Sequence, residues 1–279
     1  MIVKSIFRSG LFAGKSAIVT GGGSGIGKAI TSELLYLGCN VMIASRKLDR
    51  LENAANELKT ITPPGDDQPK PKIEFMECNI KKEEQVHSLI SNTLDKFGKL
   101  DFLVNNGGGQ FYSPAKDFSL KGWNAVIETN LTGTFLCCQQ AFNQYMSEHG
   151  GVIVNMVANM WNGWPGMSHS GAARAGVENI TKSLAIEWAP AGIRINAVAP
   201  GSTIASQSVK DYYKFDIMGQ QIPRVPAKRL GTVEEVSAAI CFLLSPAAAF
   251  ISGETIKIDG AQSLYTTSIP WEVSGRYQN

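Results

Sequence analysis

Short apolar runs alternate with stretches of helical length along the whole chain, and this alternation limits the fold more than any other feature. Strands of nearly continuous apolar character, separated by helices, indicate a parallel sheet covered on both faces. Right-handed connections between such strands predict a three-layer αβα sandwich, with ligands at the carboxyl ends of the strands. The seven runs are Ser16–Thr20, Asn40–Ala44, Ile73–Cys78, Asp101–Asn105, Val152–Val157, Ile193–Ala199 and Thr255–Asp259.

The size and composition suit one α/β domain over residues 1–279, built on a doubly wound, Rossmann-type sheet of seven parallel strands. The chain has 279 residues, of which 44% are hydrophobic, so it buries a sizeable core. No internal repeat or domain linker interrupts the pattern. The net charge of +2 points to neither nucleic acid nor a membrane surface.

Two irregular segments and the cysteines add further expectations. The proline-rich stretch Thr62–Lys72 predicts a surface loop, and the segment 202–229 is expected to fold over a substrate as a lid. The five cysteines show no metal-ligand spacing, so we expect small buried hydrophobic side chains in a reducing intracellular compartment and no metal site. No apolar run reaches the roughly 18 residues that span a bilayer.

A glycine-rich stretch follows the first apolar run. Residues Thr20–Gly27 read TGGGSGIG and lead directly into a predicted helix that stops at Gly38. Glycine lets the backbone turn tightly and lets a pyrophosphate approach, while the helix N-terminus supplies unpaired N–H groups and a positive dipole end. Because the cluster lies between a strand and a helix at the head of a βαβ unit, it predicts a dinucleotide site.

The second predicted strand ends in Ala44-Ser45-Arg46-Lys47. A chain that binds NADH places Asp or Glu here, where the carboxylate accepts hydrogen bonds from the ribose hydroxyls. This chain has no carboxylate at that point, and two adjacent cations suit the 2′-phosphate of NADPH. Solvated charges at a helix start are the alternative, but they leave the missing acid unexplained. The sequence therefore favours NADPH.

Several motifs occur together in a fixed order and resemble the short-chain dehydrogenase/reductase family. The resemblance covers roughly residues 11–264. Within the family, the stretches NNGGGQF and HSGAARAGV are most similar to peroxisomal trans-2-enoyl-CoA reductases and, to a lesser degree, to 2,4-dienoyl-CoA reductases. The motifs are TGGGSGIG at Thr20–Gly27, NNGG at Asn105–Gly108, ETNLTGTF around Asn130, Pro200-Gly201, and FLLSPAAAFISGETIKIDG at Phe242–Gly260.

The resemblance implies where each part of the cofactor lies. The glycine loop would line the pyrophosphate, Arg46 would meet the 2′-phosphate, and Pro200 to Thr203 would cover the nicotinamide. Asn79 and Ile80 would flank the adenine, although relatives often have Asp where Asn79 stands. The residues expected to bind the cofactor are Gly21, Gly25, Ile26, Gly27, Ser45, Arg46, Asn79, Ile80, Asn106, Gly107, Gly108, Pro200, Gly201 and Thr203.

The catalytic tetrad that the resemblance implies is largely missing. Most relatives use a Tyr, a Lys four residues further on and a Ser one strand earlier, and the ammonium of the Lys lowers the pKa of the phenol. In this chain the Tyr position is Ser170, the Lys position is Arg174 and the Ser position is about Ala158. No tyrosine occurs in residues 155–188, so only Asn130 of the tetrad remains.

This absence changes the expected chemistry. A serine hydroxyl has too high a pKa to protonate an alkoxide at neutral pH, and arginine stays charged. Reduction of a conjugated C=C bond does not require a strong acid, because hydrogen-bond donors are enough to stabilise the enolate oxygen. We expect Ser170 to donate to the thioester oxygen, and Arg174 to bind the nicotinamide ribose or add positive potential. A helix cap and a surface cation are the respective alternatives.

Other residues near the expected site receive roles by position. Asn130 is expected to hold a backbone carbonyl and a water chain, with a plain core hydrogen bond as the alternative. Tyr112 is a candidate substitute acid, and His169 a candidate proton relay. Gln110, Phe111 and Trp161, with the neighbouring Tyr112 and Trp164, lie on loops after the fourth and fifth strands, where they would wall an acyl tunnel or pack locally.

These features together predict NADPH-dependent reduction of the 2,3 double bond of a trans-2-enoyl-CoA thioester. One alternative is a ketone or alcohol oxidoreductase that uses Tyr112 or water as acid, and another is a catalytically inactive NADPH-binding module. The resemblance implies a homo-dimer or homo-tetramer. It also suggests a peroxisome, although the C-terminal peroxisomal signal is absent and the cytoplasm is the other expectation.

Overall fold

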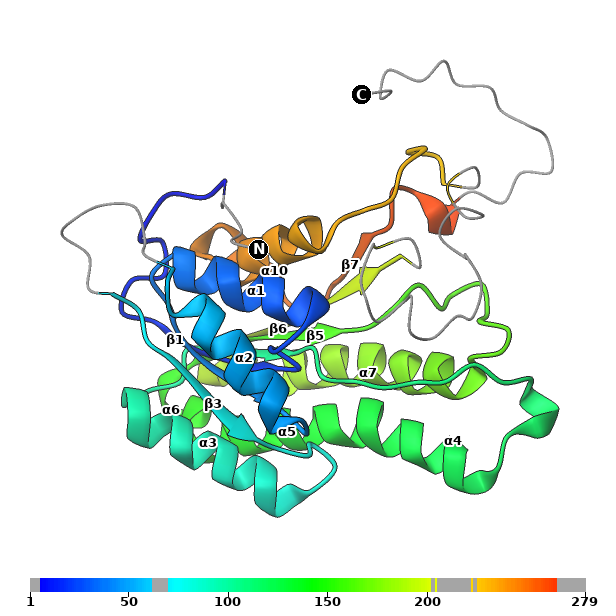
Figure 1. Cartoon of the computed structure of the whole chain (residues 1–279), viewed down its shortest axis with the longest axis horizontal. Helices are drawn as coiled ribbons and strands as arrows, with labels where there is room; N and C mark the ends of the chain where they lie inside the picture. Colours follow the sequence, from blue (N-terminus) through cyan, green and yellow to red (C-terminus); the bar gives the residue numbers. More distant parts are fainter. Residues whose placement is uncertain (1–5, 62–69, 202–203, 205–221, 223–224, 265–279) are drawn as a thin grey trace.

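The computed structural model describes residues 6–61, 70–201, 204, 222 and 225–264. All seven predicted strands are present within one residue of the expected boundaries, and they form one parallel sheet in the order β3-β2-β1-β4-β5-β6-β7 (Figure 1). The strands are β1 Ser16–Thr20, β2 Asn40–Ser45, β3 Ile73–Glu77, β4 Phe102–Asn105, β5 Gly151–Met156, β6 Ile193–Pro200 and β7 Thr255–Ile258.

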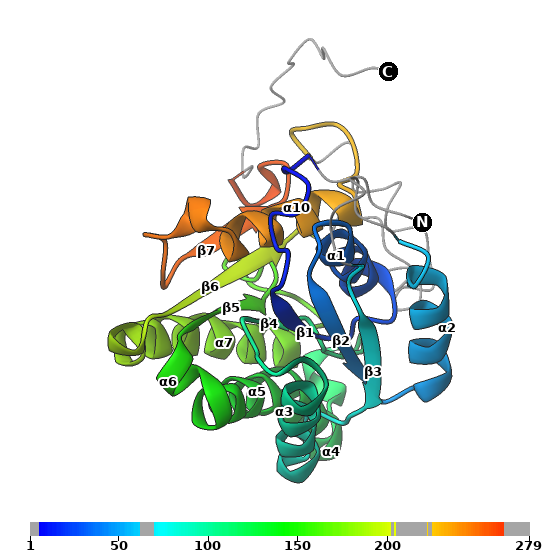
Figure 2. The ribbon, with the colours of Figure 1, turned by 90° about the vertical axis from the view of Figure 1, so that its left-hand side faces the viewer.

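Helices cover both faces of this sheet, which confirms the three-layer prediction. Figure 2 shows α1 and α10 on one side of the strands and α3, α5 and α7 on the other. The α2 helix packs with the first group, through the same apolar cluster as α1 and α10. The helices are α1 Gly25–Tyr36, α2 Leu48–Leu58, α3 Glu83–Phe97, α4 Leu120–Ile127, α5 Gly133–Ala141, α6 Ser147–His149, α7 Ser168–Glu187 and α10 Val233–Leu244.

Two apolar clusters, one on each face of the sheet, form most of the core. Successive side chains of a strand point to opposite faces, so in β1 Val19 joins the cluster under α1 and α10, whereas Ile18 joins the cluster under α3 and α5. Both side chains are fully buried. The apolar character of the strands is thus explained by burial on both faces.

The described cysteines all lie in these buried layers and none forms a disulfide. Burial raises the pKa of the Cys138 thiol to about 12, so this thiol stays protonated and unreactive at neutral pH. The expectation of small buried hydrophobic side chains is therefore confirmed. Within the described residues, no helix is both long and apolar enough to cross a membrane.

Most of the predicted lid, residues 202–229, and most of the proline-rich segment 62–72 lie outside the described residues. Of the described part, Ile204 is buried and pairs with Gly231 in an isolated bridge. Helix α10 then begins with a capping box, because the Thr232 side chain accepts from the Glu235 amide and the Glu235 carboxylate accepts from the Thr232 amide.

The helix between β4 and β5 is interrupted by two π-helical turns, η2 Glu128–Thr132 and η3 Phe142–Met146. The first joins α4 to α5 and contains the buried Asn130. A π-helical turn is rare, and it rotates the side chains that follow it relative to a regular helix. Asn130, in the first of these turns, binds Gly109 in the loop after β4, so this part of the helix faces that loop.

A chain of buried amides joins two strands to a helix. Asn105 at the end of β4 donates through Nδ2 to Oδ1 of Asn155 in β5 at 2.9 Å. Asn155 donates through its own Nδ2 to Oγ1 of Thr181 in α7, also at 2.9 Å. Buried polar groups need such partners, so the chain fixes α7 against the carboxyl ends of both strands.

We expect Asn155→Leu to lower the free energy of unfolding by about 1–3 kcal/mol, because it removes both hydrogen bonds of the amide chain from the core. The Asn105 amide then keeps its contact with Cys138 Sγ, and the Thr181 hydroxyl keeps its bond to the Val177 carbonyl. Urea unfolding followed by circular dichroism measures this change. Asn179→Leu, on an exposed position of α7, is the control and should stay within about 0.5 kcal/mol of the wild type. Equal stability of both variants would contradict the proposed role of the amide chain.

Candidate functional site

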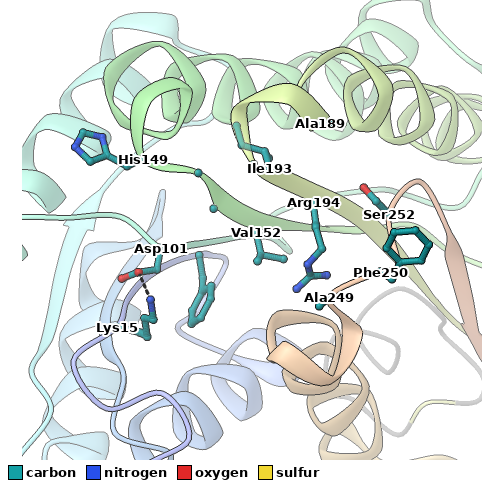
Figure 3. Close-up of a pocket in the computed structure, with 14 residues that line it drawn as sticks. Lys15, Asp101, His149, Val152, Ala189, Ile193, Arg194, Ala249, Phe250 and Ser252 are labelled. Carbon is teal, nitrogen blue, oxygen red and sulfur yellow. Dashed lines mark hydrogen bonds and ion pairs between the residues drawn. The ribbon is translucent and has the colours of Figure 1, made fainter.

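Two cavities among the described residues lie at opposite edges of the sheet. One, of about 650 Å³, lies at the amino ends of β4, β5 and β6 (Figure 3). Its charged groups are already engaged: Lys15 pairs with Asp101 at 2.8 Å, and the Arg194 guanidinium donates to the Leu243 carbonyl at 2.8 Å. In open parallel sheets, ligands bind at the carboxyl ends of the strands, so this cavity is not the candidate.

The second cavity has about 710 Å³ and lies at the carboxyl edge. Residues that follow each of β1 to β6 contribute to it, so loops far apart in the sequence meet there. Five cationic side chains line it, Arg46, Lys47, Arg50, Lys81 and Arg174. The described residues of its lining include no carboxylate, no histidine and no tyrosine.

The glycine loop forms one wall and permits close backbone approach. Gly21 has φ +69°, a conformation that favours glycine, and a Cβ there would lie 2.8 Å from Asn106 Nδ2. A Cβ on Gly27 would overlap the carbonyl oxygen of Gly21. The loop ends at Ser24, whose side chain makes no cap hydrogen bond, and α1 has no acid in its first turn. Its first amides therefore face the cavity without an anionic partner.

Asn106 ties the loop after β4 to the glycine loop. Its Nδ2 donates to the Thr20 carbonyl at 3.0 Å, and the neighbouring Gly107 amide donates to Thr20 Oγ1 at 2.8 Å. The side-chain amide of Asn106 thus stabilises the glycine loop. The family resemblance predicted that Asn106 binds the cofactor, but it did not indicate this contact with Thr20.

The turn after β2 presents cations to the cavity. Ser45 closes this turn, because its hydroxyl accepts from the Lys47 amide at 3.3 Å and donates to the Lys47 carbonyl at 3.4 Å. Arg46 and Lys47 follow as exposed side chains on the cavity wall. The hydroxyl of Ser45 therefore shapes the turn that presents Arg46.

Asn130 holds the backbone of the loop after β4. Its Nδ2 donates to the Gly109 carbonyl at 3.0 Å, and its Oδ1 accepts from the Gly109 amide at 2.9 Å. Both ends of the side-chain amide therefore bind the backbone of one residue, Gly109, and Asn130 itself does not line the cavity. The expected contact with a backbone carbonyl is confirmed. The geometry makes Asn130 a positioning residue for the segment that carries Gln110.

Gln110 connects this loop to α7. Ser170, which is buried, donates through Oγ to Gln110 Oε1 at 2.7 Å. Gln110 lines the cavity and Ser170 does not. With its carbonyl oxygen engaged by Ser170, the carboxamide keeps its two N–H donors for a group in the cavity.

Arg174 lines the cavity one helical turn beyond Ser170. It is 8% exposed, and its guanidinium donates to the Met156 carbonyl at the end of β5. A Cβ on Gly108 would overlap this guanidinium, so glycine is needed where the two meet. The structure thus holds a largely desolvated cation beside the loop that carries Gln110.

An aromatic group fixes the neighbouring Phe111. The Phe111 ring meets the His169 ring edge-on at 4.5 Å between centroids, and Phe118 stacks on His169 at the same separation. Burial lowers the pKa of His169, so this side chain is neutral at neutral pH. Because His169 is absent from the cavity lining, its role here is to pack the loop.

Most, but not all, of the predicted site residues line this cavity. Tyr112 is 55% exposed and packs against Gly166, and Trp161 is 37% exposed and donates to Glu178 at 3.0 Å. Neither lines the cavity, nor does Gly25, while Thr203 lies outside the described residues. The predicted residues that do line it are Gly21, Ile26, Gly27, Ser45, Arg46, Asn79, Ile80, Asn106, Gly107, Gly108, Gln110, Phe111, Arg174, Pro200 and Gly201.

Comparison with known proteins extends these observations. The family model described as "Enoyl-(Acyl carrier protein) reductase" matches residues 21–261. A probable 2,4-dienoyl-CoA reductase of Bacillus subtilis (strain 168) is 37% identical over 254 residues, which cover 90% of this chain and 97% of that protein. The peroxisomal 2,4-dienoyl-CoA reductase of Rattus norvegicus is 33% identical and covers 91% of this chain and 86% of its own length.

A solved structure is also similar along most of its length. It is titled citronellol catabolism dehydrogenase (AtuB), from Pseudomonas aeruginosa PAO1, with 49% sequence identity and a TM-score of 0.81. The match covers 93% of this chain and 99% of that one. The two kinds of relative therefore share the fold but are named for different substrates.

We expect Gly27→Ala to weaken dinucleotide binding by about 10- to 100-fold, because the added Cβ forces the loop apart at the Gly21 carbonyl. Quenching of tryptophan fluorescence on titration with NADPH measures the affinity. Gly171→Ala is the control, since a Cβ there would lie at an ordinary 3.7 Å from Trp164. Unchanged affinity in the Gly27 variant would remove the glycine loop from the binding site.

Proposed function

Because the chain belongs to the short-chain dehydrogenase/reductase family, we propose that it is an oxidoreductase that reduces a conjugated carbon–carbon double bond of an acyl-CoA thioester with NADPH. The observation that carries this proposal is the cavity lining, which combines five cations with amide and hydroxyl donors and includes no described carboxylate, histidine or tyrosine. Such a lining stabilises negative charge, but it does not supply a strong acid.

The preference for NADPH rests on the turn after β2. Arg46 and Lys47 line the cavity, and no described carboxylate accompanies them there. The glycine loop can turn this tightly because a Cβ at Gly21 or Gly27 would collide with Asn106 or with the Gly21 carbonyl, and a tight glycine turn before a helix suits a pyrophosphate. The residues present therefore fit the cofactor, which when bound supplies a hydride to the β-carbon of the substrate.

Gln110 is the proposed donor to the thioester oxygen. Hydride addition at the β-carbon moves charge to this oxygen, which becomes an enolate. An amide N–H stabilises this charge by hydrogen bonding without giving up its proton. Ser170, predicted as the donor, reaches the substrate only through Gln110 in this arrangement, because its hydroxyl is bound to Gln110 Oε1.

Arg174 is the second group proposed to stabilise the negative charge on the thioester oxygen. The guanidinium is largely desolvated and stays charged, so its potential acts over the cavity with little screening by water. We assign it to the nicotinamide ribose or to the developing enolate. The α-carbon then takes its proton from water.

The relatives favour a dienoyl thioester over the trans-2-enoyl thioester that the sequence predicted. Both named enzymes are 2,4-dienoyl-CoA reductases, one bacterial and one peroxisomal. Hydride would add at the β-carbon of an enoyl thioester and at the δ-carbon of a dienoyl thioester. The same oxygen carries the charge in either case, because the double bonds of both substrates are conjugated with the thioester carbonyl. The residues proposed above therefore serve both reactions equally.

A second candidate is dehydrogenation of a terpenoid alcohol. It is favoured by the 49% identity to the structure titled citronellol catabolism dehydrogenase. Alcohol oxidation needs a base at the hydroxyl, and Tyr112, the predicted substitute, lies off the cavity. The thioester reaction is therefore the better fit to the described lining.

We expect NADPH oxidation with a 2,4-dienoyl-CoA or trans-2-enoyl-CoA, and none with ketones. The absorbance of NADPH measures turnover on both thioesters, on a ketone panel and, in the reverse direction, on citronellol with NADP⁺. Turnover of citronellol without turnover of either thioester would overturn the proposal in favour of the second candidate. Tight NADPH binding with no turnover anywhere would instead indicate an inactive cofactor-binding module.

We expect Gln110→Leu to lower kcat on the thioester by about 100- to 1,000-fold, as for loss of one oxyanion donor, with NADPH affinity unchanged. Steady-state kinetics and fluorescence titration measure the two quantities. Ser170→Ala should lower kcat less, by about tenfold, because it frees the carboxamide to rotate. Wild-type turnover in Gln110→Leu would exclude Gln110 as the donor.

A further inference from the structure

The loop after β5 brings a further amide side chain to the cavity. Asn159 belongs to the cavity lining, as do Gln110 and Arg174. The tetrad position in this loop is about Ala158, which has no polar side chain. Asn159 therefore stands outside the tetrad positions, and no motif in the sequence marks it.

The carboxamide of Asn159 is not committed to the described part of the protein. The residue is half-buried, and its side chain makes no hydrogen bond to any residue that the structure describes. Two other amides near the cavity are engaged by the protein, because Asn106 donates to Thr20 and Asn130 binds Gly109. Both N–H donors of Asn159 are therefore open to a group in the cavity.

The backbone is fixed on both sides of Asn159. On the strand side, the Met156 carbonyl accepts from the guanidinium of Arg174. On the other side, Met160 is buried, and its carbonyl accepts from the Gly163 amide at 3.1 Å. Asn159 lies between these two anchors, so its position at the cavity wall is restrained.

The outer part of the same loop is held by Trp161 and Asn162. The Trp161 indole donates to Glu178 in α7 at 3.0 Å, and Nζ of Lys257 in β7 lies 4.4 Å from the centre of the indole ring. The second contact is a cation–π interaction. Asn162 donates through Nδ2 to the Ser263 carbonyl at 3.2 Å. Trp161, predicted to wall an acyl tunnel, thus helps to position the loop after β5.

The topology brings Asn159 and Gln110 to the same edge of the sheet. β4 and β5 are neighbouring parallel strands, and Asn105 at the end of β4 is in register with Asn155 in β5. Gln110 follows Asn105 by five residues, and Asn159 follows Asn155 by four. The two amides therefore come from adjacent loops, both of which line the cavity.

We propose that Asn159 is a second catalytic donor, which binds the thioester oxygen together with Gln110. This inference rests on the proposed reduction of an acyl thioester. Hydride addition moves a pair of electrons onto this oxygen, which then accepts more than one hydrogen bond. Donors from two separate loops fix the direction of the carbonyl and also stabilise its charge. Neither amide loses its proton, so water remains the source of the proton that completes the reduction.

Two substitutions separate a donor from a residue that only fills space. Asn159→Leu removes both N–H donors without adding charge, and we expect kcat on the thioester to fall about 100-fold. Asn159→Asp keeps the shape of the side chain but places a carboxylate against the enolate oxygen. Because like charges repel, we expect this variant to lose about a further tenfold. A residue that only filled space would give the opposite order, with the isosteric Asp variant closer to the wild type.

Steady-state kinetics with the better thioester substrate measure kcat and KM, and fluorescence titration measures the affinity for NADPH. We expect the NADPH dissociation constant of Asn159→Leu to stay within about twofold of the wild type, because the donor acts on the substrate. Asn179→Leu is the matched control, since it makes the same change at an exposed position of α7. Its kcat and its NADPH affinity should equal those of the wild type.

Wild-type kcat in Asn159→Leu would overturn this role. So would a kcat in Asn159→Asp equal to or above that in Asn159→Leu, because it would show that the shape of the side chain matters rather than its donors. A loss of NADPH affinity as large as the loss of kcat would place Asn159 on the cofactor and also overturn the proposal. A wild-type protein that turns over no acyl thioester would instead refute the proposed function, before Asn159 is considered.

Discussion

Parallel pairing of all seven strands brings every strand's carboxyl end to one edge of the sheet. The loops after β1 to β6 must therefore share that edge, and the backbone there becomes crowded. The crowding is resolved by missing side chains at Gly21, Gly27 and Gly108 and by the Asn106 amide, which joins two loops. The cavity exists because these loops approach closely without filling the space between them.

The elements of the fold follow from local sequence, whereas the contacts within the site do not. Apolar runs and helical spacing predict the strands and helices, and the glycine-rich motif predicts one wall of the cavity. The bond between Ser170 and Gln110 joins residues 60 positions apart, so no local pattern reveals it. Arg50 lines the cavity, but in the sequence it cannot be distinguished from an ordinary solvated cation on a helix. Trp161 and Tyr112 were assigned by loop position, which does not fix the direction of a side chain.

Electrostatics then limits what this cavity accepts. Cations from four different loops or helices line it, and one of them, Lys81, pairs with Glu128 at 2.6 Å. Anionic ligands or solvent would reduce the mutual repulsion of these cations. A dinucleotide phosphate and a thioester enolate both suit such a lining. The buried guanidinium of Arg174 differs from the exposed Arg46, because water screens it less and its effect on nearby charge is larger.

An amide donor is weaker than a phenol paired with an ammonium, so its value depends on being held in place. Three residues restrain the loop after β4 in this structure. Asn130 binds the N–H and the C=O of Gly109, Ser170 donates to Oε1 of Gln110, and His169 packs against Phe111. Among the residues at the tetrad positions, Asn130 and Ser170 thus act on the loop and Arg174 adds charge to the cavity. In the proposed mechanism, the helix that ordinarily supplies an acid instead orients a donor, which suits an oxygen that needs stabilisation rather than protonation.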